Sequence, residues 1–356
     1  MNHQPEQINP DFEDIMDQAY SLPNGRAKIA LLEEAIRIAD SLGDVEQGYS
    51  AREELVETCT FSGHPMKALV AFSWLLGQFD QQPDEYDDFT LLWSYKWILD
   101  SIASFPEINR AQIEELLADM RRRYEQFGYS ERSYYYYRFS LLKDYGEVEE
   151  AQHFLDKTKA MDRDEMSDCE ACEQHQFVEF EVMKGNDEQI IRTARPILRG
   201  RMTCGEVPHL TLSKVLMPLY RQGKLEEAEK YQKQGYRLIK GNRDFVLHSG
   251  EHMYYLLNID LLQALEVFEQ WVGLSLDHEN PRDKMMFNAY AAVLFKRLVA
   301  DGNVKSVKLP AGYPYPEEAN DLPAIASRLE QMALETAGRL DQRNGNSYYT
   351  TLIQQL

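Results

Sequence analysis

Three cysteines and a histidine in the second half of the chain have the residue types and spacing of a zinc site. Cys169 and Cys172 form a C-x2-C pair in the segment SDCEACEQH, and Cys204 lies in the segment RMTCGEVPH, five residues before His209. Thiolate sulphur and imidazole nitrogen are ligands that zinc prefers, and four of them complete a tetrahedral shell. A shell closed by these four residues leaves no open position, so the predicted Zn²⁺ is structural rather than catalytic.

The same residues admit other interpretations, which the sequence leaves open. Free cysteines also serve as small buried hydrophobic residues, and a C-x-x-C pair can be redox-active, although the thioredoxin-like form needs a strand–helix setting that this sequence does not predict. His175, His248 or His252 could replace His209 as the fourth ligand. No H-E-x-x-H motif, phosphate-binding glycine loop or G-x-S-x-G elbow occurs, so we do not predict an enzyme.

The elements that must position these residues are helices joined in pairs. Phe139 to Thr158 is FSLLKDYGEVEEAQHFLDKT, and Met217 to Gly235 is MPLYRQGKLEEAEKYQKQG. Each contains an apolar helical segment, a glycine turn, a charged first turn, an alanine five residues after the glycine and a second amphipathic segment. Candidate turns recur about every forty residues, at Asn24-Gly25, Gly63, Phe105-Pro106, Gly146, Gly185, Gly223, Asp260 and Gly302.

Over roughly residues 26–300 the chain resembles the tetratricopeptide repeat superfamily, in which paired helices stack into a right-handed superhelix. The residues that carry the resemblance are a turn glycine and the small residue five positions later: Gly63 and Ala68, Gly146 and Ala151, Gly223 and Ala228. A small residue is needed there because the two helices of a pair cross closely at that point. Other solenoids of helical pairs share this pattern.

We therefore predict an all-α fold, a right-handed superhelical solenoid of about seven tetratricopeptide-like hairpins with a C-terminal capping helix. Residues 1–10 are expected to be a frayed N-terminus and 11–302 the solenoid. Residues 303–318 are a proline-containing loop, because the prolines at 310, 314 and 316 disfavour helix. Residues 319–356 are the capping helix and a tail.

Stacking of the pairs has two consequences for the candidate sites. The helices that begin near Cys169 and His209 become neighbours of the same polarity, so the four predicted ligands meet at one edge of the solenoid. The resemblance also implies that the first helix of each pair lines a concave groove that binds peptides or partner helices. Counting back from each turn glycine places eight residues in that groove: Tyr136, Ser140, Lys143, Glu179, Met183, Met217, Tyr220 and Arg221.

Composition narrows the classes of partner and compartment. A formal net charge of −21 disfavours a nucleic-acid surface, because binding phosphates requires clustered lysines and arginines. The N-terminal segment MNHQPEQINPDFED lacks the features of a signal peptide. No apolar run approaches the roughly 20 residues of a membrane span. Four cysteines in a chain of 356 residues do not form a disulfide framework. We expect a cytoplasmic protein.

The function expected from these observations is a scaffold or adaptor that binds a protein or peptide in the concave groove, with a structural Zn²⁺ holding two repeats together. Two alternatives remain. One is a peptide-sensing regulator without a DNA-binding domain, because the acidic N-terminus carries no basic recognition helix. The other is a metal-dependent enzyme. The oligomeric state does not follow from the sequence.

Overall fold

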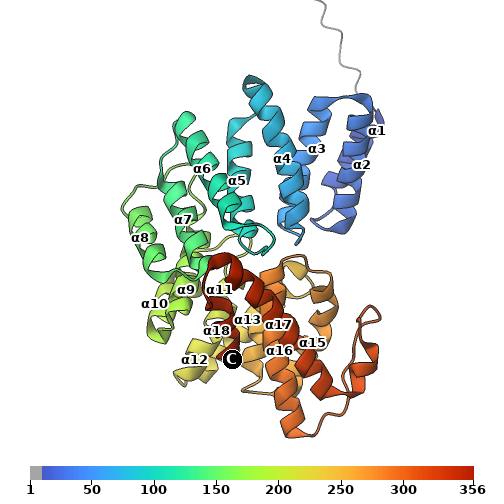
Figure 1. Cartoon of the computed structure of the whole chain (residues 1–356), viewed down its shortest axis with the longest axis vertical. Coiled ribbons are helices and arrows are strands. Elements are labelled where there is room, and N and C mark those ends of the chain that lie inside the picture. The colour runs from blue at the N-terminus through green and yellow to red at the C-terminus, as the bar shows by residue number, and fades with distance from the viewer. Residues whose placement is uncertain (1–9) are drawn as a thin grey trace, which may run out of the picture. The chain divides into compact units, whose positions relative to one another are not determined.

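The computed structural model describes residues 10–356, and these residues form helices and connecting loops without any β-strand. The chain divides into two compact units, one ending at Ser101 and one running from Ile102 to Leu356 (Figure 1). The first nine residues of the segment predicted to be frayed lie outside the described residues, and Pro10 begins the first helix. Within residues 10–356 no helix has both the length and the apolar composition needed to cross a membrane.

The first unit consists of helices that follow one another and pack against their neighbours along the chain. α1 packs on α2, α2 on α3 and α3 on α4. Asp44 caps α3 by accepting a hydrogen bond from the backbone N–H of Gln47. The elements are α1 (Pro10–Tyr20), α2 (Arg26–Leu42), α3 (Val45–Thr60), α4 (Pro65–Gln81), the 3-10 helix η1 (Pro83–Glu85) and α5 (Asp88–Ile102), whose last residue lies just beyond the boundary.

The second unit contains the candidate site residues, and its helices pair in the order expected of hairpins. α7 packs on α8, α9 on α10, α11 and α12 on α13, and α14 on α15. The elements up to α15 are α6 (Arg110–Gln126), α7 (Arg132–Tyr145), α8 (Val148–Lys159), α9 (Glu170–Lys184), α10 (Asp187–Leu198), α11 (His209–Lys214), α12 (Leu216–Arg221), α13 (Leu225–Ile239), η2 (Arg243–Phe245), α14 (Val246–Leu256) and α15 (Leu261–Leu276).

Local sequence explains where the hairpins turn. Gly146 ends α7 in the left-handed conformation with φ of 82°, which a residue with a side chain adopts at a cost, and Gly185 does the same for α9. Ala151 and Ala228, five residues after their turn glycines, are fully buried. The all-helical fold class and the pairing of neighbouring helices therefore agree with the sequence-based prediction.

The first helix of the hairpin that turns at Gly223 is broken, which the sequence analysis did not predict. α11 ends at Lys214, and α12 begins at Leu216. Pro218 has no N–H to donate to the carbonyl of Lys214, and its ring would clash with that carbonyl in a continuous helix. Pro196 has a milder effect, because α10 continues through it and ends two residues later.

The C-terminal region packs back onto the unit. α16 (Pro281–Asp301) lies against α17 (Leu322–Asn344), and the segment between them contains only the 3-10 helix η3 (Pro316–Asn320). The tail forms a further helix, α18 (Tyr348–Gln354). A core cluster containing Met285, Ala337, Leu340, Tyr349 and Ile353 joins α16, α17 and α18. α17 also contacts the beginning of this unit, since the Arg343 guanidinium donates to the Phe105 carbonyl at 3.1 Å.

Candidate functional site

Three of the four predicted metal ligands lie together where α9 begins. Cys169 is the N-cap of α9, Cys172 lies in its first turn, and Cys204 lies in the loop between α10 and α11. The Sγ atom of Cys172 is 2.8 Å from that of Cys169 and 3.4 Å from that of Cys204. All three sulphur atoms lie within 4.8 Å of one another. Three thiols at these separations can bind one metal ion.

Backbone N–H groups point at two of these sulphur atoms. The N–H of Cys172 donates to the Cys169 sulphur at 3.2 Å, and the N–H of Val207 donates to the Cys204 sulphur at 3.3 Å. Such bonds stabilise thiolates, which are the metal-binding form of cysteine. The hydrogen bond between the Cys169 and Cys172 side chains is the largest cause that lowers the pKa of Cys169 to about 6, and backbone N–H groups lower it further. The same pairing and burial raise the pKa of Cys172.

His209 does not join the cysteines. Among the described residues, the group of potential ligands around the three sulphur atoms contains no histidine. The His209 ring stacks on Phe245 with a centroid separation of 5.7 Å and an interplanar angle of 4°, and its Nδ1 atom is buried without a hydrogen-bond partner. The attraction of an aromatic surface on the next hairpin turns this side chain away from the position expected for it.

The three alternative histidines are also outside the cysteine cluster. His175 Nδ1 hydrogen-bonds with the Thr211 hydroxyl at 3.1 Å, and His248 Nδ1 with the Ser213 hydroxyl at 3.0 Å. His252 is fully buried, and neither of its ring nitrogens has a partner. The charge of Cys169 also affects Glu206, a carboxyl that the sequence analysis did not consider. Burial raises the pKa of Glu206, and the charge of Cys169 raises it further.

A buried ion pair also connects the start of α9 to α7. The Arg132 guanidinium at the start of α7 binds both carboxylate oxygens of Glu173, each at 2.7 Å, and both side chains are nearly inaccessible to solvent. Arg163 binds the same carboxylate at 2.6 Å. Glu173 follows Cys172 directly. The start of α9 therefore contacts α7 through Glu173 and the loop before α11 through Cys172.

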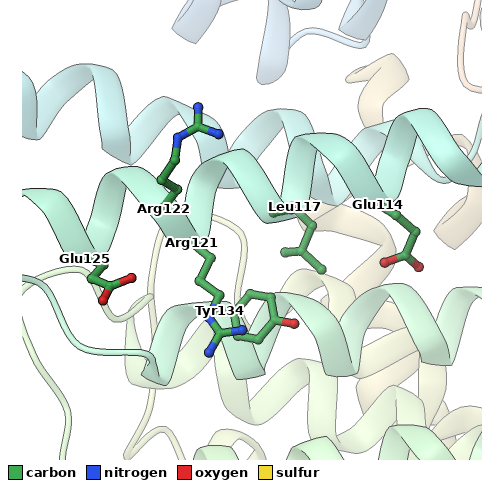
Figure 2. Close-up of a pocket in the computed structure, with 7 residues that line it drawn as sticks. Glu114, Leu117, Arg121, Arg122, Glu125 and Tyr134 are labelled. Carbon is green, nitrogen blue, oxygen red and sulfur yellow. The ribbon is translucent and has the colours of Figure 1, made fainter.

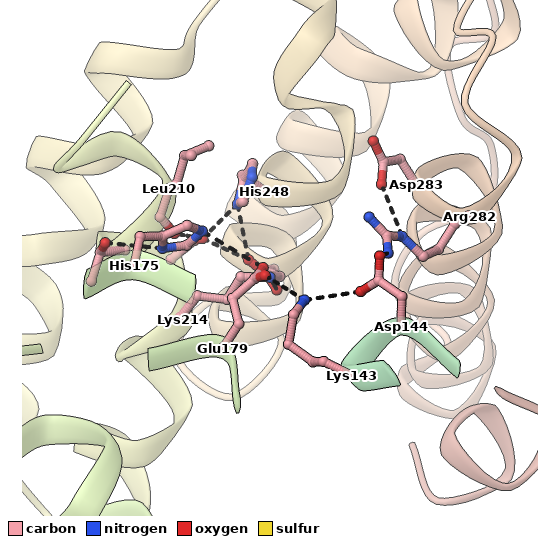
Figure 3. A network of polar contacts seen from close by, with 12 residues as sticks. Lys143, Asp144, His175, Glu179, Leu210, Lys214, His248, Arg282 and Asp283 are labelled. Atoms are coloured by element: carbon pink, nitrogen blue, oxygen red, sulfur yellow. Dashed lines mark hydrogen bonds and ion pairs between the residues drawn. The ribbon is translucent and has the colours of Figure 1, made fainter. Parts of the chain in front are cut away.

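A ladder of alternating charges crosses the first helices of four consecutive hairpins (Figure 3). Lys143 on α7 lies 3.1 Å from a carboxylate oxygen of Glu179 on α9. Lys214 on α11 lies 3.0 Å from the other oxygen of Glu179 and 2.7 Å from Glu251 on α14. We call the surface that carries these four residues, together with Met183 and Met217 one helical turn further on, the first-helix face.

The ladder continues into α16. The Lys143 ammonium donates to the Asp144 carboxylate at 2.9 Å, and Arg282 forms an ion pair with the same carboxylate. Asp283 lies next to Arg282, with 3.9 Å between its carboxylate and the Arg282 Nε atom (Figure 3). It also accepts a hydrogen bond from His278 at 3.3 Å. The network thereby joins α7 to α16, which are separated by more than a hundred residues of sequence.

Mutual pairing keeps these buried groups charged. Burial alone would lower the pKa of Lys143 and of Lys214, but neighbouring carboxylates outweigh it and raise both. Burial alone would raise the pKa of Glu251, but Lys214 and His248 lower it to about 2. Burial lowers the pKa of His175 to about 3, so this ring is neutral at pH 7. The network is a set of compensated charges rather than a group of free acids and bases.

The residues predicted to line the groove divide into two sets. Tyr136, Ser140 and Lys143 are buried, and Glu179 is bound within the ladder. Met183, Met217 and Tyr220 are half-buried, and Arg221 is exposed but bound to Asp187 at 2.6 Å. Other ladder residues were not predicted, although a signal existed. Lys143, Glu179, Lys214 and Glu251 recur at nearly the hairpin interval with alternating sign.

The C-terminal segment, residues 346–356, binds at the end of α7, next to Lys143 and Asp144. The Tyr349 hydroxyl donates to the Asp144 carbonyl at 2.7 Å, and the Asn346 side-chain amide donates to the Tyr145 carbonyl at 2.6 Å. The Tyr348 side chain packs against Gly146, where an added Cβ atom would lie 2.5 Å from Tyr348 Cγ. One end of the first-helix face is therefore already covered by another part of the same chain.

A separate depression lies on the surface of α6 and α7 (Figure 2). It has a volume of about 360 Å³, and the Arg121 guanidinium lies 4.6 Å from the Tyr134 ring centroid within it. Its arginines already have acidic partners, because Arg121 pairs with Glu131 and Arg122 with Asp119. None of the predicted site residues lines this depression.

Neither a protein-family model nor a curated protein matches this sequence.

Proposed function

We propose that this chain is a binding protein that holds a protein or peptide partner on the first-helix face of its second unit. The observation that supports this proposal best is that the chain's own C-terminal segment binds next to this face, at the end of α7. Side-chain donors of that segment bind backbone carbonyls, and an aromatic ring packs on a glycine. Docking of a short helix through apolar anchors is also a common way in which a protein binds a peptide partner.

The accessible part of the face suits a partner with apolar anchors. Met183, Met217 and Tyr220 are half-buried, and Met217 and Tyr220 also pack against the core of the unit. Methionine adapts its shape to different partners, and tyrosine supplies a large contact area with little loss of conformational freedom. The resemblance to tetratricopeptide repeats points to the same surface. The proposal assigns no catalytic step to the chain.

We further propose that Cys169, Cys172 and Cys204 hold a Zn²⁺ ion that connects two hairpins, with three protein ligands and one of its four positions open. The donor set fits the ion, because three sulphur atoms converge and two already accept backbone N–H bonds. The bound ion would connect the start of α9 to the loop before α11, the two helices that carry Glu179 and Lys214. Thiolate ligation of this kind suits a reducing compartment such as the cytoplasm.

The experiment that tests the binding function is selection of peptides from a random phage-displayed library on the immobilised full-length chain. Selected peptides are then titrated against Met217→Glu on the first-helix face and against Leu262→Glu on α15, where the leucine is 60% exposed. We expect Met217→Glu to weaken binding by about tenfold or more and Leu262→Glu to leave it unchanged. Equal effects of both variants, or no selected peptide, would contradict the proposal.

A further inference from the structure

The contacts of the C-terminal segment satisfy backbone groups that α7 leaves open. The last four carbonyls of an α-helix have no partner within the helix. Those of Asp144 and Tyr145 belong to the last turn of α7, and they accept hydrogen bonds from Tyr349 and Asn346, which lie about two hundred residues later in the sequence. The segment thus recognises a helix end and not only a hydrophobic surface.

Gly146, at this helix end, differs from the turn glycines of two other hairpins in what occupies the space beside it. Gly146, Gly185 and Gly223 have similar positive φ values of 82°, 73° and 72°. A Cβ atom added to Gly185 or Gly223 would meet nothing within 4 Å, whereas one added to Gly146 would collide with Tyr348. Among these three turns, only the one at Gly146 receives an aromatic side chain in the space that the missing Cβ leaves.

A short turn and a few polar contacts join the segment to α17. Gly345 ends α17 in the left-handed conformation, and Asn346 and Ser347 are exposed. The Asp341 carboxylate receives the backbone N–H groups of Tyr349 and Thr350, each at 2.9 Å. α18 itself has seven residues, and Ile353 is its deepest apolar anchor after Tyr349. A helix this short depends on its docking contacts for stability.

We propose that the end of α7, formed by Asp144, Tyr145 and Gly146, is a docking site for a short helical segment. Its ligand begins with a side-chain amide, followed two and three residues later by aromatic residues, the second bearing a hydroxyl. The C-terminal segment 346–356 is the internal ligand of this site, and a partner segment of the same chemistry displaces it. This inference rests on the proposed binding function and gives it a partner class and a means of regulation.

The test uses a fluorescent synthetic peptide of residues 346–356 and the full-length chain. In a released variant, Asn346→Ala/Tyr348→Ala/Tyr349→Phe, the internal segment loses its polar and aromatic contacts but keeps its apolar anchors. Fluorescence anisotropy is expected to show the peptide binding this variant about tenfold or more tightly than wild type. A peptide with alanine in place of both tyrosines is the control ligand and is expected not to bind.

Two glycine variants in the released background identify the site. Gly146→Ala and Gly223→Ala impose a similar backbone cost, but only the first fills the space that receives Tyr348. We expect Gly146→Ala to abolish peptide binding and Gly223→Ala to retain it. A released variant with wild-type helicity that binds no peptide would overturn the inference, as would equal binding by the two glycine variants.

Hydrogen exchange of the wild-type chain gives a second measurement if the released variant does not fold. A displaceable segment opens on its own, so the amides of α18 should exchange faster than those of α16 and α17. Exchange of α18 only together with global unfolding would overturn the inference. Library peptides that bind without competing with peptide 346–356 would leave the binding function standing and remove this site from it. If peptide 346–356 binds but the library yields no peptide, the docking site at the end of α7 stands and the wider binding function does not.

Discussion

The Nζ atom of Lys214 lies 2.7 Å from a carboxylate oxygen of Glu251, on the first helix of the next hairpin. The same ammonium group also binds Glu179 of the preceding hairpin at 3.0 Å. One cation therefore compensates two buried carboxylates that belong to different hairpins. Lys214 therefore connects three successive hairpins.

Replacing Lys214 with methionine should destabilise the chain by about 3–5 kcal/mol, because it leaves buried carboxylates without their shared cation. Urea denaturation at pH 7 measures the loss. Lys233→Met is the matched control, since Lys233 pairs with Glu229 on the surface, where the two side chains are 70% and 60% exposed. Its effect should stay within about 0.5 kcal/mol. Equal effects of the two substitutions would show that the ladder does not stabilise the fold.

Metal analysis of protein purified without a metal-affinity tag should find about one zinc ion per chain. Cys172→Ser should lose the ion and lower the melting temperature, because Cys172 lies between the other two thiols. His209→Ala should retain the ion, since this ring stacks on Phe245 instead of joining the cysteines. Loss of zinc in His209→Ala, or no zinc in wild type, would contradict the assignment.

The stability of the folded chain should fall as the pH drops from about 6.5 toward 3, in part because of His252. Burial lowers the pKa of this histidine to about 3 in the folded chain, whereas the unfolded chain takes up a proton near pH 6.5. Between these values the unfolded state binds more protons, so acid favours unfolding. His252→Leu should flatten the dependence of the unfolding free energy on pH across this window. An unchanged slope would be inconsistent with a neutral buried ring.

Glu53 should have the opposite dependence in the first unit. Burial, and then the nearby charge of Asp87, raise the pKa of Glu53 to about 7. The folded chain holds this proton while the unfolded chain releases it near pH 4.5, so stability falls as the pH rises between these values. Glu53→Gln should therefore raise the melting temperature at pH 8 and leave it unchanged at pH 4. The same increase at both pH values would exclude a titrating carboxyl as the cause.

The part of the fold that the sequence predicted depends on local signals. Turn glycines such as Gly146 and buried alanines such as Ala151 predict a hairpin from about twenty residues of sequence. The hairpins predicted in this way are present. The break beside Val215 had a local signal in Pro218 that was not used. The helix at Tyr348 had no such signal, because a segment this short is helical only through its contacts with distant residues.

The candidate site divides in the same way. Cys169 and Cys172 are neighbours on one helix turn, and hairpin stacking brings Cys204 to them, so their clustering followed from the repeat. The position of the His209 ring follows from Phe245, an aromatic contact that sequence spacing does not reveal. The surroundings of Lys143 likewise include a residue distant in sequence, because Arg282 pairs with the Asp144 carboxylate beside it.

Contacts between the ends of the second unit bear on how it folds. Arg343 and Phe105 are separated by 238 positions, and Tyr349 and Asp144 by 205. An open array of repeats can nucleate anywhere and grow by adding neighbours, but a unit in which α18 caps α7 cannot complete its α7–α8 hairpin until residues 346–356 have been synthesised. High contact order slows folding. The second unit should therefore complete its folding late in synthesis, rather than pair by pair as it leaves the ribosome.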